Sequence, residues 1–217
     1  MHRHARHAQH AQTRTRERRH RLAHEAARLM AEGGLRDYHQ AKLKAAERLG
    51  IHDDASLPRN REIEDALREY QRLFQKDGDT LTQQCREAAL RAVTFFSAFE
   101  PRLVGAVLDG TADAHTAVSL HLHCDDADAV SRFLDEHRIP AVLRSRRLRL
   151  DREREADFPV WVFSAEGLTF DLTVLPLDIL RQAPLAAVDE KPMRRASAAQ
   201  LRQLLAEAEI QSYELRR

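Results

Sequence analysis

Cysteine and long apolar runs are both scarce in this chain of 217 residues. Only Cys85 and Cys124 occur, the first in a helical pattern and the second at the end of a strand pattern. They therefore fit neither a disulfide framework nor the spacing of a zinc site. No run of about 18 apolar residues is present to cross a membrane, and the basic N-terminus lacks the apolar segment of a secretion signal. We predict a cytoplasmic protein in a reducing compartment, with no membrane partner.

The chain also lacks the short motifs of several common enzyme classes. It contains no Gly-x-Gly-x-x-Gly fingerprint, no Walker A loop and no Ser-His-Asp pattern. No internal repeat is visible either. None of these enzyme motifs therefore competes with the interpretation of the segment at residues 105–120.

Charge is nearly balanced over the whole chain, at a formal +1, but it is distributed unevenly. Residues 1–21 hold seven Arg against one Glu, a local charge of +6, which leaves −5 for residues 22–217. This composition predicts a disordered, solvated arm over 1–21. The alternative is an arm whose arginines contact phosphate groups. The arm also carries five histidines, which are His2, His4, His7, His10 and His20.

Apolar periodicity predicts that the first half of the chain is entirely helical. The clearest helix has Ile63, Leu67, Tyr70 and Phe74 on one stripe at 3.6-residue spacing. Gly50 follows another apolar stripe and is the residue type that ends a helix in the left-handed conformation. The predicted helices span about 15–33, 36–49, 62–75 and 80–98.

Beyond Pro101 the pattern changes to strands. Alternating polar and apolar residues predict five strands and two helices, with a hairpin loop at residues 165–167. The predicted strands are 102–109, 116–123, 141–151, 158–164 and 168–175, and the helices are 126–139 and 197–209. The fold class is therefore α+β, with a helical region over 22–79 followed by a mixed sheet flanked by helices over 80–217.

The segment GAVLDGTADAHTAVSL, residues 105–120, resembles the signature of the nucleotidyltransferase superfamily. This DNA polymerase beta-like fold includes minimal nucleotidyltransferases and antibiotic-modifying adenylyltransferases. Its signature is a strand ending in Gly-Ser, a second glycine, and then a Ser-Asp-hydrophobic-Asp-Leu strand. Without a gap, the matching positions here are Gly105, Gly110, Thr116, Val118 and Leu120. The resemblance implies transfer of a nucleotide from a nucleoside triphosphate, with Mg²⁺ as cofactor and with Gly105, Gly110, Thr111 and Ser119 as nucleotide-binding residues.

The chain departs from this signature at the positions that carry its chemistry. Ala106 stands in place of the phosphate-binding serine, and Ala117 and Ser119 stand in place of two metal-binding aspartates. The third carboxylate of the family lies on a later strand, where Asp171 alternates in phase with its polar neighbours. One carboxylate does not organise two magnesium ions, so the resemblance implies a degenerate catalytic site with Asp171 as the remaining catalytic residue.

Histidines offer an alternative metal site. His121 and His123 alternate onto the same strand face as Ser119, and together with Asp171 they form a ligand set for Zn²⁺ or another transition metal that prefers imidazole. The alternative interpretation is that both histidines are ordinary strand residues that face solvent or a polar groove.

Two basic segments are candidates for phosphate or RNA contacts. The strand predicted at 141–151 carries Arg144, Arg146, Arg147 and Arg149, and Arg152 follows it. Such a row of charges either binds phosphate or protects an edge strand from aggregation. The second segment is a predicted phosphate-binding loop that contains Lys191, Arg194 and Arg195.

Three functions follow from these observations. The first is a nucleotidyltransferase-like protein that has lost catalysis and binds a nucleotide, RNA or a protein. The second is an active, metal-dependent transferase with a non-standard site. The third is a structural or oligomerisation scaffold in which the helical half binds a protein partner. The sequence does not give an oligomeric state.

Overall fold

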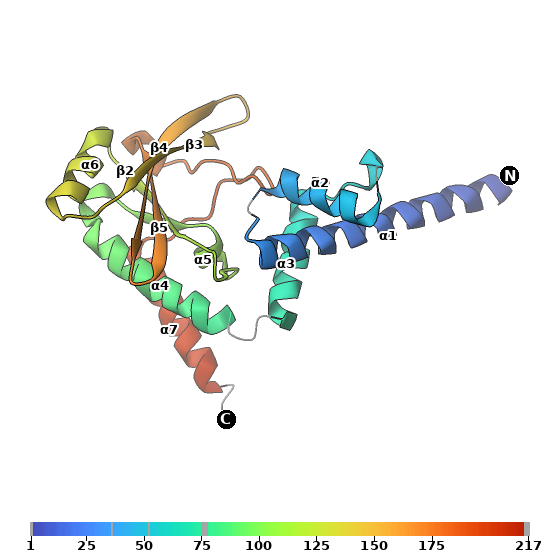
Figure 1. Cartoon of the computed structure of the whole chain (residues 1–217), viewed down its shortest axis with the longest axis horizontal. Helices are drawn as coiled ribbons and strands as arrows, with labels where there is room; N and C mark the ends of the chain where they lie inside the picture. The colour runs from blue at the N-terminus through green and yellow to red at the C-terminus, as the bar shows by residue number, and fades with distance from the viewer. Residues whose placement is uncertain (1, 36, 52, 75–77, 215–217) are drawn as a thin grey trace. The chain divides into compact units, whose positions relative to one another are not determined.

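The computed structural model describes residues 2–35, 37–51, 53–74 and 78–214 (Figure 1). The chain divides into two compact units, one comprising Met1–Lys76 with Ala187–Asp189, and the other Asp77–Ala186 with Glu190–Arg217. This arrangement of helices followed by a mixed five-stranded sheet flanked by helices confirms the predicted α+β class. None of the helices in the described ranges is both long and apolar enough to cross a bilayer.

The first unit is built from helices that bury alanine-rich faces. Its core contains Leu22, Ala26 and Ile63, each fully buried. Small side chains at the contact let helices approach closely, and the α1 helix packs against both α2 and α3. The elements of this unit are α1 (His2–Gly33), α2 (Tyr38–Leu49), the short 3₁₀ helix η1 (Asp54–Ser56) and α3 (Asn60–Phe74).

Local sequence signals fix the ends of α2. The Asp37 side chain accepts a hydrogen bond from the Gln40 backbone N–H at 2.7 Å and so caps the first turn. Gly50 adopts the left-handed conformation, with φ 62°, and its N–H returns to the carbonyls of the last turn. The predicted terminator at Gly50 is confirmed.

The basic arm is helical, contrary to the prediction of disorder over 1–21. Helix α1 begins at His2 rather than near Thr15 (Figure 1). No glycine or proline interrupts residues 2–32, and Ala, Gln and Arg all have high helix propensity, so the helix continues through the arm. From Thr13 to Arg21 the side chains are exposed or half-buried, and Leu22, the next residue, is buried.

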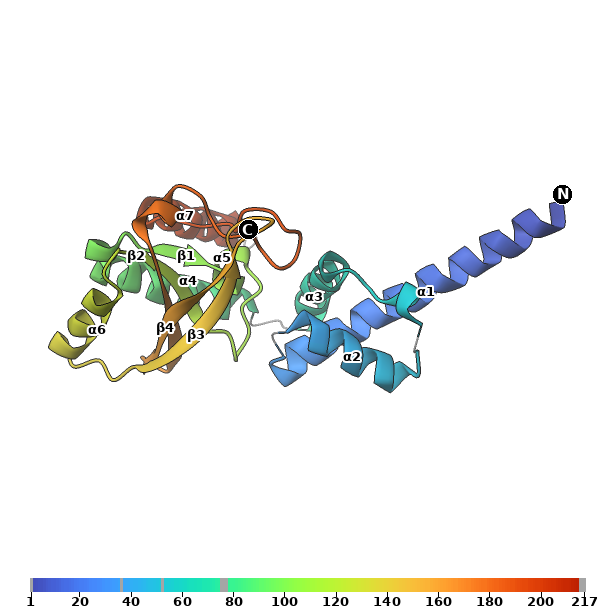
Figure 2. The same cartoon turned by 90° about the horizontal axis from the view of Figure 1, so that it is seen from above.

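The second unit is a five-stranded sheet with strand order β1-β2-β5-β4-β3. Strands β2 and β5 are parallel, while the other neighbouring pairs are antiparallel. Strands β3 and β4 lie side by side in both views (Figure 1, Figure 2). The strands are β1 (Arg102–Val104), β2 (Val118–His123), β3 (Val142–Arg149), β4 (Glu155–Ala165) and β5 (Leu168–Leu175). The remaining elements are α4 (Gly78–Phe95), η2 (Ser97–Phe99), α5 (Ala106–Asp109), α6 (Ala127–Glu136), η3 (Leu177–Leu180) and α7 (Ala198–Glu214).

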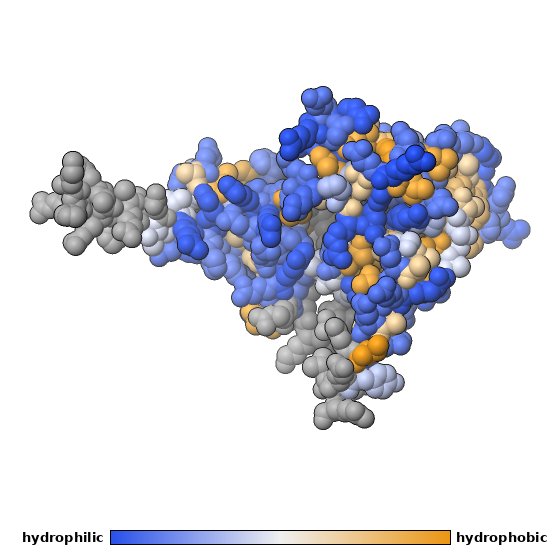
Figure 3. Space-filling view, turned by 180° about the vertical axis from the view of Figure 1, so that it is seen from behind, coloured by the Kyte–Doolittle hydropathy of each residue, from blue (hydrophilic) through white to orange (hydrophobic). Residues whose placement is uncertain are grey.

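One face of this sheet is apolar and carries the main core. Alternate residues of β2 and β5, such as Leu120 and Leu172, are fully buried there. They pack with Phe96, which directly follows α4, and with Leu134 of α6 and Leu201 of α7. On the face seen in Figure 3 the surface is mainly hydrophilic, with separate hydrophobic patches. Because side chains alternate along a strand, the neighbours of these apolar residues project to the opposite face, where the predicted site lies.

Two turns decide where strands end in the sheet unit. The predicted hairpin loop is confirmed: Glu166 and Gly167, with φ 53° and 76°, connect β4 to β5, as in a two-residue turn that matches the strand twist. The predicted strand 102–109 is wrong beyond Val104. Gly105 has φ 73° and ψ −157°, which turns the chain into the single helical turn α5.

We predict that Gly105→Ala destabilises the sheet unit by about 1–3 kcal/mol, because its backbone conformation is open essentially to glycine alone. A Cβ at Gly105 would meet no atom within 4 Å, so backbone strain is the whole cost. Urea unfolding followed by the fluorescence of Trp161, the one tryptophan, reports this unit. The control Gly33→Ala, at the end of α1 and with no atom within 4 Å of a Cβ, leaves this transition unchanged. An unchanged midpoint for Gly105→Ala would contradict the prediction.

Candidate functional site

The sheet register brings three of the predicted site residues to neighbouring strands. Ser119 of β2 pairs with Val104 of β1 on one side and with Asp171 of β5 on the other. Gly105 directly follows Val104. The segments that carry Gly105, Ser119 and Asp171 therefore lie side by side at one end of the sheet.

Asp171 is held by two neighbours on the polar side of the sheet. Its side chain is only 11 % exposed. The Ser119 hydroxyl donates to Asp171 Oδ2 at 2.9 Å. The Arg146 guanidinium, from β3, donates to both carboxylate oxygens, with Nη1 3.0 Å from Oδ1 and Nη2 3.1 Å from Oδ2. This fork-to-fork geometry is the strongest arrangement of an arginine and a carboxylate, so an internal cation neutralises the carboxylate.

Arg146 is fixed in place by a third contact. Its Nη1 also donates to the hydroxyl of Thr173 at 3.1 Å, and Thr173 is fully buried. The guanidinium reaches from β3 across the intervening strand β4 to side chains on β5. We call the set of Ser119, His121, His123, Arg146, Asp171 and Thr173 the polar sheet face.

The predicted metal sites do not assemble. In the sheet register His121 pairs with Thr173 and His123 with Leu175, so the two rings lie two and four residues beyond the Ser119–Asp171 pair. The centroids of the two rings are 6.5 Å apart, and the Asp171 carboxylate is already paired with Arg146. Within the described ranges no three His, Cys, Asp or Glu side chains are grouped to hold a metal. Both oxygens of Asp171 accept from Arg146, so the site does not fit Mg²⁺ either.

His121 and His123 are buried rather than exposed in a groove, each being 1 % accessible. Burial lowers the pKa of His121 to about 3, with further contributions from His123, Arg146 and Arg195. The pKa of His123 is also lowered, mainly by burial. Both rings are therefore neutral at physiological pH.

Each of these rings has one nitrogen that no described residue pairs with. His123 Nδ1 lies 2.8 Å from the Glu100 carbonyl oxygen, so Nδ1 carries the proton and donates it. His123 Nε2 and His121 Nδ1 have no hydrogen-bond partner among the described residues. The polar sheet face thus contains unused hydrogen-bonding capacity next to a buried ion pair.

Arg195 adds a second cation near these rings. Its guanidinium donates to the carbonyl oxygens of Ile179 and Leu180, at 3.0 Å each. Burial lowers the pKa of Arg195, and the positive charge of Arg102 lowers it further. No carboxylate among the described residues pairs with Arg195. The sequence predicts that Arg195 belongs to a phosphate-binding loop. In the structure, the Arg195 guanidinium is held by two backbone carbonyls.

The glycine loop after β1 is held by contacts within the protein. Gly110 ends α5 in the left-handed conformation, and the buried Thr111 donates its N–H to the Ala106 carbonyl. Arg86 of α4 donates to the carbonyls of Val107 and Leu108, at 3.1 Å each. The predicted nucleotide-binding residues Gly105, Gly110 and Thr111 therefore shape this turn, and the stabilising role of Arg86 was not evident from the sequence.

The basic row on β3 is divided between paired and unpaired arginines. Arg147 and Arg149 both pair with Glu155, at 3.0 and 3.3 Å. Arg144 and Arg152 are exposed and make no hydrogen bond or ion pair within the described residues. Arg144 alternates in phase with Arg146, so it projects from the same face of β3.

The segment 190–196 borders a small cavity. Arg194 pairs with Asp109 at 2.8 Å, which ties this segment to α5. The cavity is about 230 Å³ and is lined by Leu108, Arg194, Arg195, Ala196, Gln200, Gln203, Leu204 and Glu207. These residues come from α5, α7 and the segment that precedes α7.

We predict that Arg146→Met lowers the free energy of unfolding by about 1–3 kcal/mol, because it leaves the Asp171 carboxylate with one hydrogen bond in a buried position. This loss is smaller than for a fully buried ion pair, because the Arg146 side chain is 38 % exposed and water screens its charge. Arg144→Met, on the same strand face, changes stability by less than about 0.5 kcal/mol. Adding Asp171→Asn to Arg146→Met restores part of the loss in a double-mutant cycle. If the two arginine variants are equally stable, the pair has no energetic role.

We predict that the free energy of unfolding decreases as the pH falls from about 6.5 towards 3, because of the buried histidines. The unfolded chain binds a proton at His121 below its ordinary pKa of 6.5, whereas the folded protein does not until about pH 3. Each such group therefore removes up to about 1.4 kcal/mol per pH unit as the pH falls. We expect His121→Leu to reduce the slope of the free energy of unfolding against pH by an amount that corresponds to up to one bound proton. Urea unfolding followed by Trp161 fluorescence measures this slope. Identical slopes for the two proteins would contradict the assignment.

Comparison of the chain with protein-family models, with curated proteins and with solved structures finds no match. The resemblance of residues 105–120 to the nucleotidyltransferase signature is therefore an interpretation of a short motif, and the functional conclusion depends on the chemistry of the polar sheet face.

Proposed function

We propose that this chain is a nucleotidyltransferase-like protein that no longer catalyses metal-dependent transfer and instead binds phosphate groups of a nucleotide or RNA. One observation carries this proposal. The carboxylate that corresponds to the last metal ligand of the family, Asp171, has both oxygens paired with Arg146. A fixed guanidinium supplies the positive charge at that position.

Loss of metal-dependent transfer follows from the coordination chemistry. Two-metal phosphoryl transfer needs several charged oxygen ligands, which hold two ions about 4 Å apart. Ala117 has no oxygen in its side chain, and the Ser119 hydroxyl is neutral and already donates to Asp171. Since Asp171 is also occupied by Arg146, these positions offer no free carboxylate to a divalent ion.

The excess of cations supports an anionic ligand. Arg102, Arg146 and Arg195 lie on or beside the polar sheet face, against the carboxylates of Asp171 and Glu100. Arg195 is half-buried without a carboxylate partner among the described residues, an arrangement that a bound anion stabilises.

The exposed edge of the sheet adds a cation that is free to bind. Arg144 projects from the same face of β3 as Arg146 and is not engaged by any described residue. Guanidinium groups bind phosphate through two parallel hydrogen bonds, which makes arginine well suited to nucleotides and RNA.

The proposal predicts binding that needs no metal and weakens with salt. We expect labelled single-stranded RNA or ATP to bind equally in Mg²⁺ and in EDTA at matched ionic strength, measured by fluorescence anisotropy. For RNA, Arg144→Ala lowers the slope of log affinity against log salt by about 0.7, the contribution of one phosphate contact in a single strand.

Arg132→Ala is the matched control for this experiment. It also removes one exposed arginine, but from α6, which packs on the apolar face of the sheet. We expect it to leave the salt slope unchanged. Nucleotide transfer in Mg²⁺ that disappears in Asp171→Ala would overturn the proposal in favour of an active transferase.

A further inference from the structure

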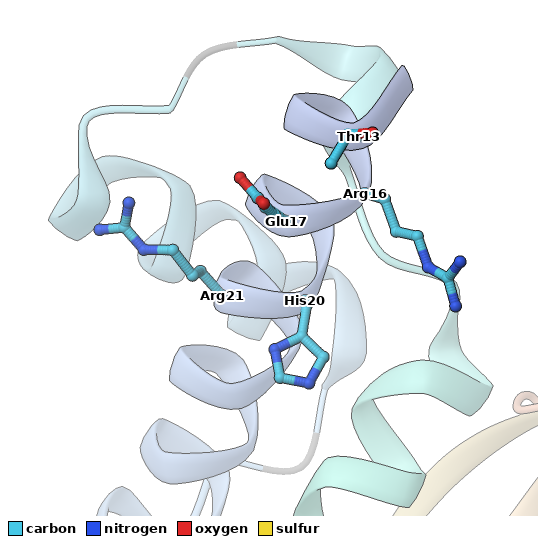
Figure 4. A pocket seen from close by; sticks show the side chains of 5 residues that line it. All are labelled: Thr13, Arg16, Glu17, His20 and Arg21. Atoms are coloured by element: carbon cyan, nitrogen blue, oxygen red, sulfur yellow. The ribbon is translucent and has the colours of Figure 1, made fainter. Parts of the chain in front are cut away.

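Two histidines of the helical unit face each other on one side of α1. His20 and His24 are one turn apart, and their Nε2 atoms are 3.1 Å from each other. The ring centroids are 4.3 Å apart with an angle of 42° between the rings. His20 also lines a shallow pocket with four other side chains of α1, which are Thr13, Arg16, Glu17 and Arg21 (Figure 4).

The separation of the two nitrogens matches that of a metal chelate. Imidazole nitrogens lie about 2.0–2.1 Å from Zn²⁺ and similar ions, so two ligands are about 2.9 Å apart at a right angle and about 3.4 Å apart at a tetrahedral angle. The 3.1 Å between His20 and His24 falls within this interval. An ion can therefore lie within bonding distance of both nitrogens, provided that each ring carries its proton on Nδ1.

The surroundings of the pair leave it open to solvent ions. The His24 side chain is 39 % exposed, and His20 is also exposed. Glu69 Oε2, on α3, is 3.9 Å from His24 Nε2, which is too far for coordination but suits a hydrogen bond to a metal-bound water. Glu17 lies one turn before His20 and adds a second negative charge, while Arg16 and Arg21 lie beside the pocket.

We propose that His20 and His24 chelate one divalent transition-metal ion that prefers imidazole, of the class of Cu²⁺, Ni²⁺ and Zn²⁺. The site has two protein ligands, in agreement with the absence of any three-ligand group within the described ranges. Water completes the coordination, and Glu69 orients one of these waters. This site belongs to the helical unit and is independent of the function proposed for the polar sheet face.

The position of the pair gives the ion a structural effect. Leu22 is buried, and of the four residues before it Arg18, His20 and Arg21 are exposed while Arg19 is half-buried. His20 therefore lies just before the packed part of the helix and His24 lies within it. An ion bound to both rings fixes the helical conformation across this junction.

Copper binding tests the proposal directly. The other histidines of the arm are removed by replacing His2, His4, His7 and His10 with alanine, and the parent chain is studied in parallel. We expect isothermal titration with Cu²⁺ to give one high-affinity equivalent in the replaced chain. Electron paramagnetic resonance should show coupling to two imidazole nitrogens.

Single substitutions identify the ligands. His20→Ala or His24→Ala lowers the affinity for Cu²⁺ at least about tenfold, because the second imidazole binds intramolecularly. His39→Ala, an exposed histidine on α2, leaves the affinity unchanged. Circular dichroism confirms folding of these surface variants. An affinity that is the same with and without His24, or the absence of a two-nitrogen signal, would overturn the proposal.

Discussion

The bidentate pairing of Arg146 with Asp171 is the interaction on which the polar sheet face depends. It joins β3 to β5 across β4, and it supplies a counter-charge to a carboxylate that is nearly buried. Without Arg146, Asp171 would hold a negative charge in a low-dielectric position supported by Ser119 alone. The same pairing occupies Asp171, the residue that the resemblance to the nucleotidyltransferase signature aligns with a metal-binding carboxylate.

Burial sets the character of the remaining polar groups. His121 and His123 are held neutral by desolvation and by nearby arginines, so they add hydrogen-bonding capacity without charge. Arg195 keeps its charge beside them by donating to backbone carbonyls. The result is a face with more arginines than carboxylates and with two imidazole nitrogens that no described residue pairs with.

Periodicity was sufficient to predict the α+β class and the hairpin at Glu166-Gly167, and it placed Ser119 and Asp171 each on the polar side of its own strand. It failed at Gly105, because an apolar run does not reveal that one glycine takes a conformation that ends the strand. It also failed for the arm, where composition alone did not reveal a continuous helix. The pairing of Arg146 was not predictable, because it depends on the order of β3, β4 and β5 in the sheet, which strand patterns do not specify.

The central claim is that Arg146 occupies Asp171 in place of a metal ion. Titration of the isotope-labelled protein with Mn²⁺, a paramagnetic substitute for Mg²⁺, tests it most directly by nuclear magnetic resonance. The account predicts no selective broadening of the Ser119 and Asp171 amide signals in the parent protein, and the appearance of broadening in Arg146→Met, where the carboxylate becomes available. Selective broadening of both signals in the parent protein at micromolar Mn²⁺ would contradict it.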